Sequence, residues 1–259
     1  MAGDIAQKTV TVPKDTRKNM YTDDPNLEKP ENINVKIWRY MDLWKFMHML
    51  TTSMLHFTRV DNLDDPNEGS WQPSTIYEVY KNQGDQYINN LKYWEKVFRT
   101  IGAVNCWHVN NSESQKMWEL YVPSGNGVVI QSTYGLLRNE MQKYDDRTCT
   151  IGMMQYIDYE KEKFESCTQN TLGRFTDFFT YKDRNFKHEN ELRALIMAMG
   201  DQNNQAKAIP KQGINLKVVL SDLIQTVYLS PNAQDWKLDL LKKLISDYKI
   251  EIEVSPSLL

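Results

Sequence analysis

The chain has 259 residues, of which 41% are hydrophobic and 25% are charged, and its formal net charge is −3. This composition excludes a disordered chain, and the near-neutral charge gives no overall attraction to nucleic acid. The length suits one large domain.

The three cysteines, Cys106, Cys149 and Cys167, are odd in number and form no C-x-x-C pair. A disulfide framework or a cysteine-rich zinc site is therefore not expected, and isolated cysteines suit a reducing compartment. The first 34 residues lack the apolar centre of a signal peptide, and no apolar run reaches the ~20 residues of a membrane span. We expect a cytoplasmic protein without a membrane partner and with a loosely ordered arm at 1–32.

Residues 35–40 alternate as a strand, and Asp42 is placed to cap the helix that follows. A second strand is expected at 54–60, and the Asp-, Asn- and Pro-rich run at 61–69 is a loop. A helix is expected at 77–99, interrupted near Gly84.

Later in the chain, Ser112 and Gln115 form a capping-box pattern that predicts a short helix. Strands are expected at 103–109, 128–133, 148–157, 191–199, 214–220, 226–230 and 250–254. Helices are expected at 136–144 and 171–179 and around the apolar residues Trp236 to Ile245, with a polar connector at 200–213. The fold class is α+β, with a mixed, mostly antiparallel sheet, flanking helices and a C-terminal strand–helix–strand unit, in one domain over 33–259.

Arg39 and Arg59 each end an apolar strand face, where a guanidinium needs an anionic partner. Together they could form a pocket for a phosphate or carboxylate ligand, with Tyr40 beside them, and an internal salt bridge is the alternative. The loop at 64–69 adds Asp65 and Glu68, which could contact a ligand or a hard cation, or could simply form a turn that pairs with an arginine. We predict no metal site.

Two further groups of residues could take part in chemistry. Ser132 and Thr133 end an apolar strand and could orient a ligand or cap the next helix. Glu189, Glu191 and Arg193 share one face of an extended segment, so the two carboxylates could divide acid and base roles, or Arg193 could hold both ionised.

Other polar and aromatic residues are expected to be structural. The four histidines have no zinc-binding spacing. Trp107, Trp118 and Tyr121 are typical of a core, and Cys106 of a buried thiol.

Several short motifs occur in a fixed order, and they are Trp38-Arg39-Tyr40, Asp65-Pro66-Asn67-Glu68-Gly69, Cys106-Trp107, Met117-Trp118-Glu119-Leu120-Tyr121, Gly127-Val128-Val129-Ile130 and Phe186-Lys187-His188-Glu189-Asn190-Glu191-Leu192-Arg193. Over residues 33–255 the chain resembles a widespread bacterial domain family of unknown function, similar to the AbiGi-type abortive phage-resistance proteins. The resemblance implies a role in phage defence but no particular reaction. His108 departs from the small polar residue expected after Cys106-Trp107.

The order Arg39, Ser132-Thr133 and Glu189-Asn190-Glu191 also resembles the site pattern of one class of ADP-ribosyltransferases. That resemblance implies NAD as the ligand, with Arg39 on a phosphate, Ser132 on the nicotinamide ribose and Glu191 beside the developing cation.

Three hypotheses follow. The chain is an NAD-consuming enzyme, or a non-catalytic module that binds an anionic small molecule or nucleotide, or a metal-dependent hydrolase or nuclease using Asp65, Glu68, Glu189 and Glu191. The sequence does not give the oligomeric state.

Overall fold

The computed structural model describes residues 21–83, 85–143, 147–163, 167–168, 171–172, 174, 176–198 and 208–259. The predicted interruption at Gly84 and most of the predicted connector at 200–213 lie outside these residues, as do the first 20 residues of the predicted arm.

The described part of the chain is organised around a nine-stranded sheet with the order β11-β2-β3-β1-β4-β12-β13, in which β10 also pairs with β3 and with β5. Its strands are β1 (Lys36–Asp42), β2 (Met54–Arg59), β3 (Gly102–Val109), β4 (Gly127–Thr133), β5 (Cys149–Met153), β10 (Glu191–Met197), β11 (Ile214–Lys217), β12 (Thr226–Leu229) and β13 (Glu253–Pro256). Within this sheet, the described pairings are antiparallel except that of β12 with β13. The predicted mixed, mostly antiparallel sheet is confirmed.

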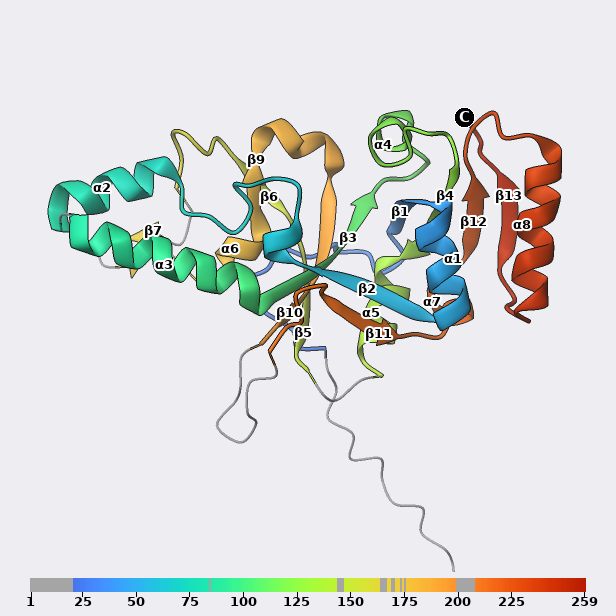
Figure 1. Cartoon of the computed structure of the whole chain (residues 1–259), viewed down its shortest axis with the longest axis horizontal. Coiled ribbons are helices and arrows are strands. Elements are labelled where there is room, and N and C mark those ends of the chain that lie inside the picture. Colours follow the sequence, from blue (N-terminus) through green and yellow to red (C-terminus); the bar gives the residue numbers. More distant parts are fainter. Residues whose placement is uncertain are drawn as a thin grey trace, which may run out of the picture.

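The sheet divides beside β3. One end of β3 pairs with β1, at Val109 and His108, whereas its other end pairs with β2, at Val104 and Ala103. On its opposite edge β3 pairs with β10 along its whole length. Figure 1 shows β3 as the long strand from which β1 and β2 diverge.

Helices and short strands surround this sheet. The helices are α1 (Leu43–Thr52), α2 (Pro73–Gln83), α3 (Asp85–Ile101), α4 (Gln115–Tyr121), α5 (Tyr134–Met141), α6 (Asp177–Thr180), α7 (Leu220–Leu223) and α8 (Asp235–Asp247), with 3-10 turns η1 (Val60–Asn62) and η2 (Arg184–Glu189). The remaining strands are β6 (Gln155–Ile157), β7 (Cys167–Thr168), β8 (Thr171–Leu172) and β9 (Tyr181–Asp183).

Helix α1 shows how local sequence produces these elements. Asp42 accepts a hydrogen bond from the Lys45 backbone N–H, so it is the predicted N-cap, and Ser53 ends the helix in the left-handed conformation. Helix α1 packs its buried side chains, Phe46, Met49 and Leu50, against the sheet. Burying each such side chain contributes about 1.5–3 kcal/mol before the entropy cost of ordering it.

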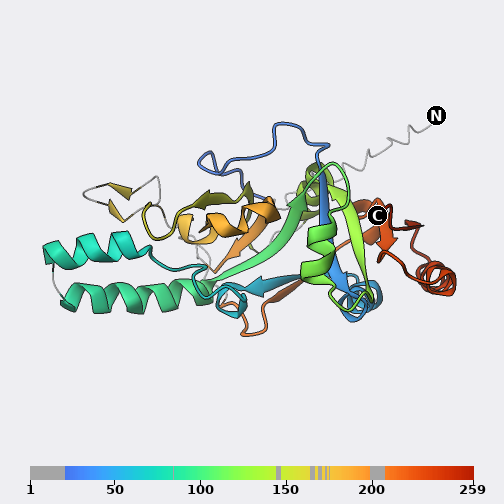
Figure 2. The ribbon, with the colours of Figure 1, turned by 90° about the horizontal axis from the view of Figure 1, so that it is seen from above.

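The C-terminal unit is the predicted crossover. Strand β12 leads into α8 and returns in β13, which pairs in parallel with β12 from Thr226 opposite Glu253. The buried side chains of α8 are Leu241 and Ile245. At the other end of the molecule, α2 and α3 run side by side and extend away from the sheet (Figures 1 and 2).

Some predicted boundaries are wrong for identifiable reasons. The N-cap of α4 is Ser114, whose hydroxyl accepts from the Met117 backbone N–H, rather than Ser112. Of the helix expected at 171–179, the described residues form only the single turn α6, because Thr171–Leu172 are the strand β8, which pairs with β7. Within the predicted arm, Tyr21 and Leu27 are buried, so the folded domain includes residues before position 33.

Two faces of the sheet have different contents. The main apolar core, which we call the apolar face, lies under α1, α5, α7 and α8 and includes Ile37, Ile130 and Leu192. The opposite face includes Trp38, Cys106, His108, Glu191 and Arg193, and we call it the charged face. Among the described residues, no helix combines the length and the apolar character that crossing a membrane requires.

Candidate functional site

A row of three side chains crosses three strands of the charged face. Trp38 on β1 lies opposite His108 on β3, and His108 lies opposite Glu191 on β10. In the next row, Arg193 lies opposite Cys106. Because paired residues in a sheet point to the same side, these side chains share one face.

Five charged side chains gather on this face and are nearly inaccessible to solvent. They are Glu68, Lys182, Glu189, Glu191 and Arg193, and each is 7% exposed or less. We call them the charge cluster. Glu68 comes from the loop before α2, Lys182 from β9 and Glu189 from the end of η2.

Each cation of the cluster bridges carboxylates. Lys182 Nζ lies 2.9 Å from Glu68 Oε1, 2.6 Å from Glu189 Oε2 and 3.6 Å from Glu191 Oε2. Arg193 donates from Nε to Glu191 Oε1 over 2.7 Å, and its Nη2 lies 2.8 Å from Glu68 Oε2. Its Nη1 donates to the Phe179 carbonyl. The cluster thus has one more carboxylate than cation.

The pairing favours the charged forms of Glu191 and Lys182 although both side chains are buried. Burial alone would raise the pKa of Glu191, but Arg193 and Lys182 lower it below its usual value. Burial alone would lower the pKa of Lys182, but the carboxylates of Glu191, Glu68 and Glu189 raise it above its usual value. Neither cation has charge left to attract a further anion.

A small hollow of about 50 Å³ lies next to the cluster, under α4. We call it the α4 hollow. It is lined by Trp38, Tyr40, Cys106, Trp107, His108, Met117, Tyr121, Glu189 and Glu191. Aromatic rings therefore form its walls, and the two glutamates form its polar side.

Several contacts hold α4 over this hollow. Tyr121 donates from its hydroxyl to Glu189 Oε1 over 3.1 Å, while its side chain stays 47% exposed. The Ser114 backbone N–H donates to the Tyr40 hydroxyl. Just before the helix, the buried carboxylate of Glu113 accepts from Trp118 Nε1, Ser257 Oγ and the Leu258 backbone N–H.

His108 presents an unused acceptor in the hollow. Its Nδ1 lies 2.6 Å from the Glu189 carbonyl oxygen, which can only accept, so Nδ1 carries the proton. Burial lowers the pKa of His108, which favours the neutral ring. Its Nε2 is buried and has no hydrogen-bond partner among the described residues, so a lone pair is available to a ligand.

Arg39 lies at the point where the sheet divides. Its side chain lies opposite Ile130, on the side of the apolar face, and among the described residues it makes one long hydrogen bond, of 3.5 Å, to the His56 carbonyl. Burial lowers its pKa, whereas electrostatic interactions with Cys106, Tyr121 and Glu191 raise it. Its Nη1 is buried without a hydrogen-bond partner in the described part of the chain, and it forms no ion pair there. Arg39 thus lies on the apolar side of β1 and does not line the hollow.

Ser132 and Thr133 are not brought to the carboxylates. Ser132 lies opposite Ile37, on the apolar face, is fully buried, and donates its hydroxyl proton to the Leu223 carbonyl over 2.5 Å. Thr133 caps α5 by accepting from the Leu136 backbone N–H, which is the alternative that the sequence left open. The arrangement therefore separates Ser132 from Glu191 by the thickness of the sheet.

Arg59 and Asp65 have local partners. Arg59 forms a two-bond ion pair with Asp61, over 2.6 and 2.7 Å, and donates to the Ile209 carbonyl. Asp65 accepts from the Asn67 backbone N–H within the turn. Arg59 is therefore already paired with its neighbour Asp61, and the joint pocket of Arg39 and Arg59 stays a prediction.

The structure therefore brings together Glu68, Glu189, Glu191 and Arg193, with Tyr40 beside them, and leaves Ser132, Thr133, Arg59 and Asp65 elsewhere. Sequence reasoning missed Lys182 and Tyr156, and it assigned Tyr121 to the core. Tyr156 accepts a hydrogen bond from the Glu191 backbone N–H. The available signal was a lysine at the end of the aromatic run Phe178-Phe179-Thr180-Tyr181-Lys182. Such a position predicts a buried lysine, and a buried ammonium group needs carboxylate partners.

The carboxylates do not resemble a metal site. Within the described residues, no group of three or more histidine, cysteine, aspartate or glutamate side chains is arranged to hold a metal ion. Lys182 and Arg193 occupy the space between the glutamates.

No model of a known protein family matches this chain, and neither does any curated protein. The resemblances to AbiGi-type proteins and to ADP-ribosyltransferases therefore stay predictions.

Proposed function

We propose that the α4 hollow binds the flat, hydrogen-bond-donating end of a small ligand, and that the nicotinamide end of NAD is such a group. The observation that carries the proposal is the unpartnered Nε2 of buried His108, beside the carboxylates of Glu189 and Glu191 and within aromatic walls.

The polar atoms of the hollow favour a donor. His108 Nε2 and the glutamate oxygens accept hydrogen bonds, and the nearby cations are already paired with carboxylates. An anion placed in the hollow would face these carboxylates. An amide N–H₂ or a ribose hydroxyl would instead find acceptors.

The walls favour a flat and positively charged ring. Tyr40 packs edge-on against Trp118, with ring centroids 5.1 Å apart. Trp38, two residues before Tyr40 on β1, lies on the same face. Aromatic faces attract cations, and the nicotinamide ring of NAD carries a positive charge. Stacking and charge would therefore act in the same direction.

The size of the hollow limits what can enter. A volume of about 50 Å³ is far below the several hundred cubic ångströms of a site for a complete nucleotide. The ring enters when the partly exposed Tyr121 moves outward, and the phosphates and adenosine lie outside the hollow. The hollow thus binds only the nicotinamide end of the ligand.

In this proposal Glu191 acts on the ligand, because its carboxylate lines the hollow. When the bond from the ribose C1′ to the nicotinamide nitrogen breaks, both bonding electrons leave with nicotinamide and positive charge develops on the ribose. A buried carboxylate stabilises that charge only as it forms, which accelerates bond breaking. Water or another nucleophile then bonds to C1′ and loses its proton. This version of the NAD-consuming hypothesis needs Glu191 but not Ser132.

The test compares ligands that carry different ends of NAD. Calorimetric titration should show binding of nicotinamide mononucleotide and at least tenfold weaker binding of ADP-ribose, which lacks the ring. Equal binding of ADP-ribose, or no binding of either, would overturn the proposal. Nicotinamide release from NAD by purified protein then separates an enzyme from a binding module, the second hypothesis from the sequence.

A further inference from the structure

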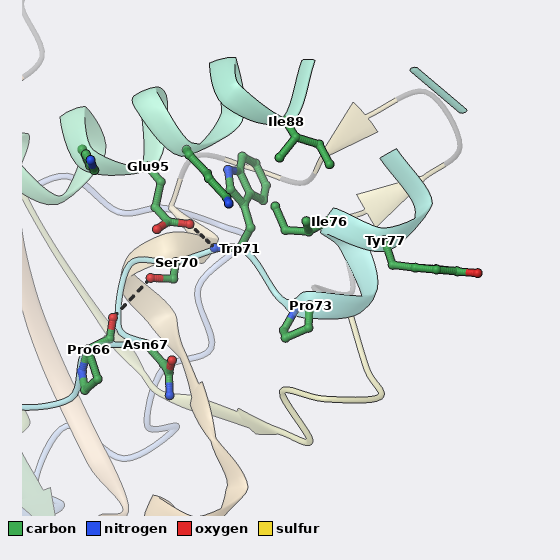
Figure 3. A pocket seen from close by; sticks show the side chains of 11 residues that line it. Pro66, Asn67, Ser70, Trp71, Pro73, Ile76, Tyr77, Ile88 and Glu95 are labelled. Atoms are coloured by element: carbon green, nitrogen blue, oxygen red, sulfur yellow. Dashed lines mark hydrogen bonds between the residues drawn. The ribbon is translucent and has the colours of Figure 1, made fainter. Parts of the chain in front are cut away.

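A second and larger hollow lies at the base of the α2–α3 hairpin (Figure 3). We call it the hairpin hollow. Its volume is about 720 Å³, within the range of small-molecule sites, and it shares no lining residue with the α4 hollow.

The floor of the hairpin hollow is apolar. Trp71 is 8% exposed and packs edge-on against Phe178, with ring centroids 4.2 Å apart, so the ring is backed by a second cluster of buried apolar side chains, separate from the core under α1. Ile76 from α2 and Ile88 from α3 point toward each other across the space, whereas Tyr77 points away from it (Figure 3). Such a floor suits an aliphatic chain or a ring.

Hydrogen bonds fix the chain segment that forms one wall. The Trp71 backbone N–H donates to Glu95 Oε2 over 3.0 Å, and Ser70 donates to the Pro66 carbonyl. Arg99 donates to the same carbonyl over 3.0 Å. The hollow is therefore bounded by a segment tied to α3 at two points.

The rim carries two unpaired positive charges. Lys92 and Lys96 line the hollow from α3, stand four residues apart and so project from the same side of the helix. Both are exposed, and neither forms an ion pair with any described residue. Glu95, the acidic residue between them, accepts from the Trp71 backbone N–H, and the three side chains together carry a formal charge of +1.

We infer that the hairpin hollow binds a small acidic amphiphile, which is a carboxylate carried on an apolar chain or ring. The apolar body lies against Trp71, Ile76 and Ile88, and the carboxylate pairs with Lys92 and Lys96. Charge complementarity at the rim selects this ligand over a cationic amphiphile of equal length, for which the lysines are repulsive. The inference does not depend on the function proposed for the α4 hollow.

The probe is decanoate below its micelle concentration, titrated into the full chain, with decyltrimethylammonium as the oppositely charged comparison. Decanoate should bind at least tenfold more tightly than the cation. The double variant K92Q/K96Q should weaken decanoate binding about three- to tenfold, which is the range for two exposed charge pairs.

A matched control removes two exposed lysines from other elements, in K217Q/K242Q, and should leave decanoate binding unchanged. Ile88→Glu, with its fold checked by circular dichroism, should abolish binding by placing a negative charge in the floor. Equal binding of the two probes, no decanoate binding, or equal losses in the two double variants would overturn the inference.

Discussion

The main apolar core and the paired buried charges lie on opposite faces of the large sheet. The apolar face buries residues such as Ile37, Ile130 and Leu50, and burying an apolar side chain does not require one particular neighbour. The charged face buries Glu191 and Arg193, which are paired atom by atom. An apolar position such as Leu50 tolerates another apolar residue of similar size, whereas Glu191 and Arg193 each depend on one particular neighbour.

The largest expected effect comes from breaking the charge cluster. Arg193→Met leaves Glu191 and Glu68 buried with only Lys182 to compensate them. We expect the free energy of unfolding at pH 7 to fall by about 3–5 kcal/mol. Urea denaturation followed by circular dichroism measures the change.

The matched control is Arg184→Met, which removes an exposed partner of Glu162. Such a surface pair contributes about 0–1 kcal/mol. Equal losses for the two arginine variants would show that burial of the cluster has no energetic consequence.

On the apolar face, Leu50→Ala should lower the free energy of unfolding by about 2–5 kcal/mol through lost contacts and a cavity. Because no charge is involved, the loss should be the same from pH 5 to pH 8. The same denaturation series at several pH values tests this. A loss that varied with pH would mean that the two faces are energetically coupled.

The two faces should also differ in their response to protonation. His108 has a lowered pKa because it is buried, so the unfolded chain binds a proton more readily than the folded one. The stability that this histidine contributes is present above the unfolded pKa of about 6.5 and decreases as the pH falls below it. The slope cannot exceed about 1.4 kcal/mol per pH unit for one proton.

Replacing His108 by Gln should flatten the unfolding free energy between pH 5 and pH 7. The variant His48→Gln, at an exposed position on α1, should retain the wild-type slope. If both variants behave alike, the neutral buried form of His108 is not the source of the dependence.

A smaller effect is expected where α4 meets the cluster. Tyr121→Phe removes the hydrogen bond to Glu189 but keeps the ring, and the side chain is half exposed. We expect a loss of about 0.5–1.5 kcal/mol in the free energy of unfolding. Tyr93→Phe, on the exposed side of α3, is the control and should be neutral. A neutral Tyr121→Phe would mean that this hydrogen bond does not hold α4.

The same contrast explains what the sequence could predict. Periodicity identifies strands and helices because apolar burial repeats with a fixed period, and it correctly gave β1, α1, β3, β4 and the β12–α8–β13 crossover. The pattern Glu189, Glu191, Arg193 also indicated that these side chains belong together. Local sequence patterns therefore predicted most of the helices and strands.

Long-range pairing was outside the reach of such rules. Lys182 joins the cluster by pairing with Glu68, which is distant in sequence, and Ser132 leaves it because the register of β4 against β1 turns its side chain toward α7. Both outcomes depend on contacts between segments that are distant in sequence. A shift of one residue in that register would have reversed the face on which Ser132 lies.

The most direct test of the central claim compares a substitution on the charged face with a substitution on the apolar face. Calorimetric titration with nicotinamide mononucleotide should show at least tenfold weaker binding for Glu191→Gln, with the fold checked by circular dichroism, and an affinity within about twofold of wild type for Ser132→Ala. Weaker binding by Ser132→Ala together with unchanged binding by Glu191→Gln would contradict the account, because the ligand would then lie on the apolar side of the sheet.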